Sequence, residues 1–171
     1  DHYCSLNTCL SMAANAYKKC MDIDKDCNKK YLIGVAVTAS LATTYTKIGD
    51  HKFYITIQTE SLTKSLECIL KKGSRSREEE EELITEYVLC LLSECCGLKK
   101  EMPKHEEQIE ITTIKAEKSW KKLLNNEVNF ISNNRGTPEL IFPGSFNPLH
   151  DGHIKMRELA EKKTGMRATF E

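Results

Sequence analysis

Residues 139–163 read ELIFPGSFNPLHDGHIKMRELAEKK. The apolar residues 140–142, placed before Pro143, predict a short strand, and residues 153–163 predict a helix. The ten residues between them, 144–153, contain glycines and a proline and predict a sharp loop. A strand, a loop and a helix in this order are typical of a domain in which helices alternate with the strands of a sheet.

The loop carries residues suited to binding an anion. Because it opens a helix, free backbone N–H groups and the positive end of the helix dipole face it. Gly144 lets the backbone turn tightly, and Gly152 leaves space for a base or ribose against the backbone. His150 and His153 are three residues apart, so both imidazoles can point toward one bound triphosphate. A metal-binding histidine pair is the alternative, but no third ligand has suitable spacing; two solvated structural histidines are another.

This ten-residue stretch resembles the HxGH signature of the nucleotidyltransferase superfamily, especially its nicotinate/nicotinamide mononucleotide adenylyltransferase branch and its cytidylyltransferase-like members. The resemblance implies a Rossmann-like domain that transfers a nucleotidyl group from ATP or CTP to a phosphorylated acceptor and releases pyrophosphate. It implies catalytic roles for His150 and His153, which bind the triphosphate and stabilise charge on the phosphoryl group in transit. The nucleotide-binding residues that it implies are Gly144, Ser145, Phe146, Asn147 and Gly152. It implies Mg²⁺ as a cofactor carried with the triphosphate, and no metal site formed by the protein.

The resemblance covers residues 139–171, and we expect residues 138–171 to be the start of the transferase domain. The family's second phosphate-binding motif, a helix start with Ser or Thr and an Arg, would lie downstream. The last residues predict the beginning of a strand, and the sequence opens on Asp1 with no signal peptide. We therefore expect a fragment of a longer protein that is inactive alone. In it, residues 140–142 lack parallel neighbours and either stay partly exposed or pack against the front domain or the linker.

The front of the sequence predicts another α/β domain, over residues 1–98. Its apolar run YLIGVAVTA, residues 31–39, is rich in β-branched residues and favours a central strand buried on both faces, with Gly34 in it and Leu32, Val35 and Val37 mostly buried. The other expected elements are an amphipathic helix at 6–21, paired strands near 51–59 and 62–72 with Phe53, Ile55 and Ile57 on one face, and a helix at 76–96.

The last of these helices has recognisable ends. Ser76 and Glu79 have the spacing of a capping box, and Gly97 suits the end of the helix. The acidic run 78–82 lies at the positive end of the helix dipole and is expected to be a solvated first turn. His51 is expected at the surface, at the end of its strand.

Three stretches of this front domain resemble the second half of the C-terminal domain of competence-damage-inducible protein A, a family that includes nicotinamide mononucleotide deamidases. They are residues 5–16, 33–59 and 70–92, with Gly73 and Arg75 in the place of the family's G-x-R turn. The family's nucleophilic serine has no counterpart in this sequence, and the loop 38–43 lacks the family's glycines and proline. The hydroxyls of Ser40, Thr43 and Thr44 are as compatible with phosphate binding as with no function.

Residues 99–137 are expected to form a linker that contains a helix near 113–125, a short strand at 127–132 and a turn-rich boundary at 133–138. The two resemblances together imply a two-domain, cytidylyltransferase-like protein of the eukaryotic kind. Nucleotidyl transfer is the first functional hypothesis. A non-catalytic nucleotide-binding or regulatory module and an amidohydrolase acting on a pyridine nucleotide are the alternatives.

Composition limits the partners. The 25 basic and 25 acidic residues of the 171 balance to a formal net charge of zero, which disfavours nucleic acid and anionic membranes as partners. The longest apolar stretches are too short to span a bilayer. The 8 cysteines have no zinc-ligand spacing and are expected as reduced thiols in a cytoplasmic protein. The expected partners are ATP or CTP and a small phosphorylated acceptor, and the oligomeric state is left open.

Overall fold

The computed structural model describes residues 3–124, 127–131 and 139–171. The chain forms two compact units, Asp1–Val128 and Asn129–Glu171. Both units combine helices with strands, as the mixed α/β class predicted from the sequence requires.

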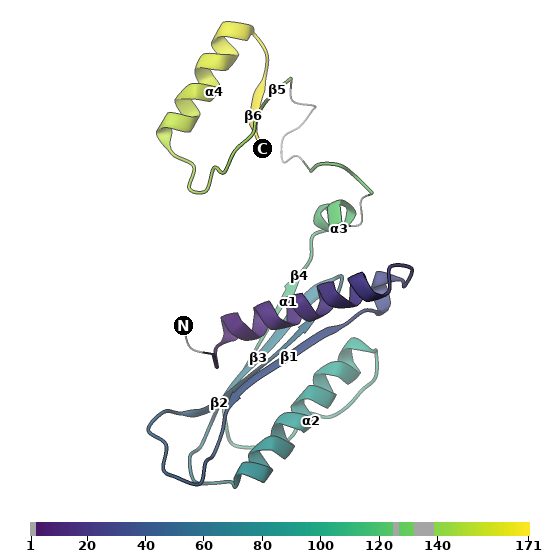
Figure 1. Cartoon of the computed structure of the whole chain (residues 1–171), viewed down its shortest axis with the longest axis vertical. Helices are drawn as coiled ribbons and strands as arrows, with labels where there is room; N and C mark the ends of the chain where they lie inside the picture. Colours follow the sequence, from purple (N-terminus) through teal and green to yellow (C-terminus); the bar gives the residue numbers. More distant parts are fainter. Residues whose placement is uncertain (1–2, 125–126, 132–138) are drawn as a thin grey trace. The chain divides into compact units, whose positions relative to one another are not determined.

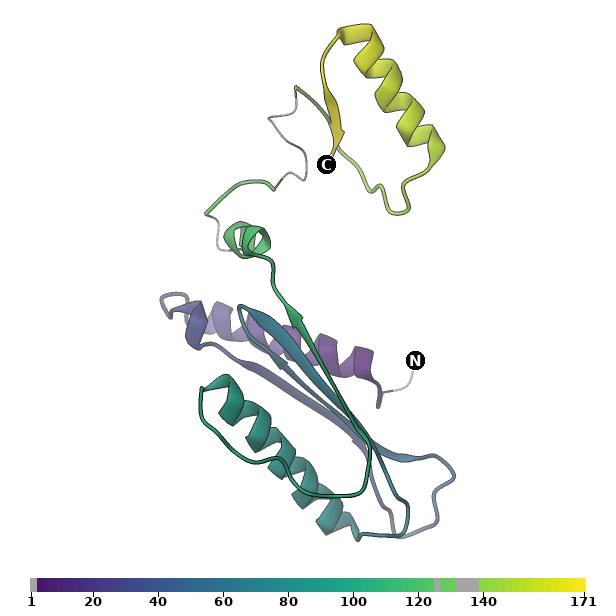
Figure 2. The ribbon, with the colours of Figure 1, turned by 180° about the vertical axis from the view of Figure 1, so that it is seen from behind.

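The first unit is built around a four-stranded antiparallel sheet with strand order β1-β2-β3-β4. Two long helices lie on opposite faces of this sheet (Figures 1 and 2). The strands are β1 (Gly34–Ser40), β2 (His51–Gln58), β3 (Leu62–Leu70) and β4 (Ile109–Lys115). The helices are α1 (Leu6–Ile23), α2 (Arg77–Cys95), the short α3 (Lys118–Leu124) and a 3₁₀ turn at Lys29–Tyr31.

The larger apolar core lies between the sheet and α2. Phe53, Ile55 and Ile57 alternate along β2 toward this helix and are fully buried, which confirms their predicted shared face. They pack against α2 through Tyr87 and Leu91. Hydrophobic burial of this size is the main stabilising term of the unit.

The opposite face of the sheet packs on α1, and the side chains that α1 buries there are small. Cys9 and Ala13 of α1 are fully buried, and the Cys9 thiol lies 3.3 Å from the carbonyl oxygens of both Ala36 and Tyr54. Gly34 allows the approach, because a Cβ atom at this position would lie 2.2 Å from the Ala13 carbonyl oxygen. The absence of a side chain at residue 34 therefore sets how closely α1 approaches β1.

The predicted ends of α2 are confirmed. The Ser76 side chain accepts a hydrogen bond from the Glu79 amide, and the Glu79 carboxylate accepts one from the Ser76 amide. At the other end, Gly97 has a φ of 74°, and the Leu98 and Gly97 amides donate to the carbonyls of Ser93 and Glu94. This is a Schellman arrangement, for which glycine is the favoured residue.

The predicted central position of the apolar strand is wrong. Strand β1 lies at the edge of the sheet, and β2 and β3 occupy the centre. Leu32, Val35 and Val37 are nevertheless partly buried, with less surface exposed than covered, in agreement with their predicted burial. Both faces of β1 are covered, because Ala36 belongs to the cluster formed with α1 and Val37 packs against the core between the sheet and α2.

The segment expected as a linker contributes to the first unit. Residues 109–115 form β4, which pairs with β3, so the sheet extends past residue 98, where the front domain was expected to end. Strand β4 also takes the first residues of the helix expected at 113–125, and α3 begins only at Lys118. Residues 127–131 form no strand, in contrast to the expectation. Ser132 and the boundary expected at 133–138 lie outside the described residues.

The second unit contains a parallel strand pair joined by a helix. Strand β5 (Leu140–Phe142) pairs with β6 (Ala168–Phe170), and α4 (Asp151–Thr164) connects them. The expectation that β5 has no parallel neighbour is therefore wrong, because the last residues of the chain supply one. Its expected partial exposure is confirmed, with Ile141 57% exposed. Within the described ranges, no helix has the length and apolar character needed to cross a membrane.

Candidate functional site

In the loop before α4, residues 144–150, and the first turn of the helix, two histidines form hydrogen bonds with backbone amides. His150 is the N-cap of α4, and its Nδ1 accepts a hydrogen bond from the Gly152 amide at 3.2 Å. The Nδ1 of His153 lies 3.5 Å from the His150 amide nitrogen and completes a reciprocal cap. Both imidazoles thus replace the Ser and Glu of a usual capping box. The helix start predicted from the sequence is confirmed, and the two histidines are brought together.

The two imidazole rings are stacked, with centroids 3.6 Å apart and planes at 27°. A neutral imidazole whose Nδ1 accepts a hydrogen bond carries its proton on Nε2. Both rings therefore have an Nε2–H that the cap leaves uncommitted. Two N–H donors on neighbouring rings beside a helix N-terminus suit the oxygens of a phosphate chain.

The glycines of the loop make room for aromatic rings. A Cβ atom at Gly144 would lie 3.0 Å from the Phe146 ring, and one at Gly152 would lie 3.0 Å from the His150 ring. The Phe146 ring meets His153 edge-on at 5.0 Å and lies 4.5 Å from Phe170 of β6. The space beside Gly152, expected to receive a base or ribose, is instead next to the His150 ring.

The remaining predicted residues, Ser145 and Asn147, are exposed on the same loop. Sequence analysis missed Arg157, which lies one helical turn after His153. Its guanidinium lies 5.8 Å from the centroid of Phe170, and its Nε is buried without a hydrogen-bond partner among the described residues. Positions 150, 153 and 157 share one face of a helix, so the spacing alone contains the signal.

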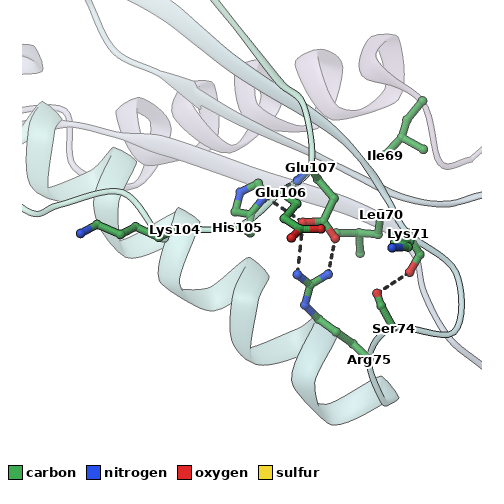
Figure 3. Close-up of a pocket in the computed structure, with 9 residues that line it drawn as sticks. All are labelled: Ile69, Leu70, Lys71, Ser74, Arg75, Lys104, His105, Glu106 and Glu107. Carbon is green, nitrogen blue, oxygen red and sulfur yellow. Dashed lines mark hydrogen bonds and ion pairs between the residues drawn. The ribbon is translucent and has the colours of Figure 1, made fainter.

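The first unit has a second cluster of charged residues, between the end of β3 and the segment that leads to β4 (Figure 3). Arg75 donates from both terminal nitrogens to the two carboxylate oxygens of Glu107. The His105 Nδ1 lies 2.9 Å from Glu107 Oε2 and 3.0 Å from the Glu107 amide nitrogen. A cavity of about 480 Å³ adjoins these residues, and Lys71 and Lys104 also line it.

Electrostatics within this cluster favour a fixed ion pair. Hydrogen bonds from Arg75 hold the pKa of Glu107 at about 2, below its ordinary value of 4.5. Burial raises the pKa of the nearby Cys68 thiol to about 11, and Glu107 adds to this rise. Cys68 is therefore a neutral thiol rather than a nucleophilic thiolate at neutral pH.

The interior side of the cluster holds two buried polar atoms without a partner among the described residues, Nε2 of His105 and the hydroxyl of Tyr87. Their rings meet edge-on with centroids 5.4 Å apart. The His105 side chain is only 4% exposed and Tyr87 is fully buried, so neither can reach a substrate in solution. The contacts of the cluster hold residues 105–107 against the first unit. The sequence predicted a linker here and did not predict these contacts.

Glu80 and His51 form another pair, and the sequence-based prediction that both residues are exposed is wrong. Glu80 is fully buried, although the acidic run containing it was expected to be solvated, and His51 is 8% exposed, although it was expected at the surface. Glu80 Oε1 lies 2.7 Å from His51 Nδ1, and Oε2 accepts a hydrogen bond from the Ala42 amide at 2.7 Å. Glu80 thus ties the loop after β1 to the start of β2.

That loop borders a cavity of about 600 Å³ lined by threonines and cations. Its cations already have partners inside the protein. Lys47 donates to Ser40 Oγ, Lys72 donates to the Lys47 and Ile48 carbonyls, and Arg77 contacts Glu81. These contacts, together with the Arg75–Glu107 pair, favour a structural role for the cationic side chains.

Groups of three or more metal-ligating side chains do not occur among the described residues. Comparison with protein-family models, with curated proteins and with solved structures finds nothing that matches this chain.

Proposed function

We propose that the loop before α4 binds the triphosphate of ATP or CTP and that the protein transfers the nucleotidyl group to a phosphorylated acceptor. The observation that carries this proposal is the pair of stacked imidazoles of His150 and His153 at the N-terminus of α4. Each has an uncommitted Nε2–H, as a donor to phosphate oxygens requires. The resemblance of residues 144–153 to the HxGH signature supports the same reaction.

The chemistry of this reaction suits the loop. Nucleotidyl transfer needs no covalent enzyme intermediate, so the protein contributes positioning and electrostatic stabilisation. The acceptor phosphate attacks the α-phosphorus, the bond to the bridging oxygen breaks, and pyrophosphate leaves with its electron pair. His150 and His153 would donate hydrogen bonds to the oxygens on which negative charge increases. In this proposal, the parallel β5–α4–β6 arrangement is the first part of a Rossmann-like domain.

Mg²⁺ fits this loop only as a companion of the triphosphate. The nearby oxygen donors are the exposed Ser145, Asn147 and Asp151, and they form no ready-made cage. Mg²⁺ commonly binds substrate phosphates with few protein ligands and retains several waters. The ion would supply charge neutralisation on the phosphates, and the chain's own residues would orient them.

Pyrophosphate release tests the proposal directly. The full-length protein, which includes this chain, would be incubated with Mg²⁺ and either ATP or CTP, together with nicotinamide mononucleotide or another phosphorylated acceptor. Triphosphate binding would be measured in parallel by calorimetry, using the same protein. Binding with acceptor-dependent pyrophosphate release supports transfer, and binding without release supports a non-catalytic nucleotide-binding module. A chain that binds neither triphosphate contradicts both functions for this loop.

A further inference from the structure

Strand β4 lies at the edge of the sheet, and most of its side chains are exposed on both faces. Of its seven residues, only Ile109 is partly buried, while Ile111 is 42% and Ile114 is 63% exposed. Edge strands are commonly protected from pairing by proline, by a bulge or by charged side chains, and β4 carries two charged residues, Glu110 and Lys115. Strand β4 contains no proline and pairs with β3 through seven consecutive residues without a bulge.

The hydrogen-bond pattern of β4 shows which backbone groups face outward. The Ala116 amide donates to the Ser61 carbonyl at 2.8 Å, next to the pair formed by Leu62 and Lys115. Since hydrogen-bonded and non-hydrogen-bonded pairs alternate in an antiparallel ladder, the even-numbered residues of β4 bond to β3. The odd-numbered residues, Ile109, Ile111, Thr113 and Lys115, present their N–H and C=O groups to the free edge.

We propose that β4 pairs with β4 of a second copy of this chain, antiparallel and centred on Thr112, so that two four-stranded sheets become one eight-stranded sheet. In this register Ile111 faces Thr113 of the second copy, and Ile109 faces its Lys115. The outward-facing groups on both copies belong to the same odd-numbered set, so they meet in the hydrogen-bonded positions. A twofold axis through the Thr112 pair lets the outward N–H and C=O groups of both strands form hydrogen bonds. Since each chain uses the same strand, the assembly ends at two chains.

The side chains of β4 suit this pairing. Thr112 faces Thr112 of the second copy, and threonine pairs across strands are favourable. Ile111 faces the methyl-bearing Thr113, and Ile114 faces the aliphatic stem of Glu110, so each exposed isoleucine gains a partly apolar neighbour. The pairing therefore removes from water part of the apolar surface that β4 exposes in one chain.

The charges of β4 are compatible with the same register. The strand carries one acid, Glu110, and one base, Lys115, and its formal charge is zero. The two copies of Glu110 lie four residue steps apart, about 13 Å, and the two copies of Lys115 lie six steps apart, about 20 Å. Each Glu110 is one step along the strand from Lys115 of the second copy, on the opposite face. Unlike charges are thus nearer to each other than like charges.

Charge reversal at the twofold axis tests the interface. Thr112→Asp and Thr112→Lys each place two like charges directly opposite each other in the proposed dimer, while the side chain is exposed in one chain. We expect wild type to sediment as a dimer and each variant to dissociate at least about tenfold more readily. An equimolar mixture of the two variants should restore the dimer, because Asp then faces Lys.

The matched control is Thr85, an exposed threonine on α2. Thr85→Asp and Thr85→Lys introduce the same charges away from β4 and should leave the dimer unchanged. Amide exchange in the wild type provides a measurement that needs no variant. The outward amides of Ile111 and Thr113 should be as protected as the inward amides of Thr112 and Ile114.

A monomeric wild type at every concentration, or rapid exchange of the outward amides alone, would overturn the proposal. So would a dimer that both Thr112 variants leave intact, since a different surface would then hold it together. Binding of an extended segment of another protein to β4 of a monomeric chain would also contradict it. The assay involves no nucleotide, so its failure is independent of the function proposed for the loop before α4.

Discussion

Arg75 and Glu107 are 32 residues apart in the chain, and both carboxylate oxygens of Glu107 accept hydrogen bonds from the Arg75 guanidinium. Arg75 immediately precedes the N-cap of α2, and Glu107 lies two residues before the start of β4. The Glu107 side chain is 6% exposed, so water screens this pair little. The contact fixes where the chain re-enters the sheet after α2.

The Arg75–Glu107 pair predicts how stability depends on pH. The pKa of Glu107 is about 2 in the folded chain against an ordinary value of 4.5. A lowered folded-state pKa stabilises the fold above the ordinary value, and this contribution is lost as pH falls from about 4.5 toward 2. Glu107→Gln should lower the free energy of unfolding at neutral pH by about 3 kcal/mol and flatten its decline over that acid interval. Urea titrations at a series of pH values measure both effects.

The control for this variant is Glu81→Gln, which removes the exposed pair that Glu81 forms with Arg77. An exposed pair four residues apart on a helix contributes only about 0.5 kcal/mol or less. Equal losses for the two variants, or an unchanged acid slope in Glu107→Gln, would contradict the role assigned to Glu107.

Gly34→Ala should destabilise the first unit by at least about 2 kcal/mol, because its Cβ would overlap backbone atoms of α1 that cannot move independently. Gly49→Ala is the matched control, since the nearest atom to its Cβ lies 4.0 Å away on the flexible Lys47 side chain. Thermal unfolding followed by circular dichroism compares the two. A Gly34→Ala protein as stable as wild type would show that α1 does not approach β1 so closely.

Glu80→Ala should cost about 3 kcal/mol of unfolding free energy, because it leaves the His51 ring and the Ala42 amide without their shared acceptor. Glu82→Ala removes an exposed acid from the same helical turn and should cost little. Guanidinium denaturation provides the comparison. Similar midpoints for both variants would place Glu80 in solvent, as the sequence pattern alone suggested.

In the full-length protein, His153→Ala should lower nucleotidyl transfer by about 10²-fold or more, the effect of losing one preorganised donor in a charge-stabilising site. Lys155→Ala, an exposed substitution on the same helix, is the control for general effects on α4. Initial rates of pyrophosphate release are compared at saturating triphosphate. Equal rates for wild type and His153→Ala would contradict a catalytic role for His153.

Amide hydrogen exchange should distinguish the two units of the chain. Strands β5 and β6 have three residues each and form a two-stranded sheet, whereas β2 is a central strand with fully buried side chains. We expect amides of 140–142 to exchange much faster than those of 53–57, because local opening requires little loss of packing. Equal protection of both segments would show that the second unit is as stable as the first.

Local signals in the sequence determined several of the elements and their ends. The period of two in residues 53–57, the capping box at Ser76 and the glycine at residue 97 each act within a few residues of chain, so pattern and propensity suffice to predict them. The strand, loop and helix around His150 were predictable for the same reason. The spacing of the two histidines predicted that both imidazoles can point toward one bound triphosphate, and the stacking of their rings was seen only in the structure.

Only the tertiary structure decided which elements are neighbours and which charges are buried. The apolar run at Gly34 indicated a strand but not its place at the sheet edge, because propensity contains no information on strand order. Glu80 looked like any other residue of an acidic run, and residues 105–107 looked like part of a charged linker. Their burial depends on His51, Ala42 and Arg75, which are distant in sequence and become neighbours only when the sheet and α2 pack together.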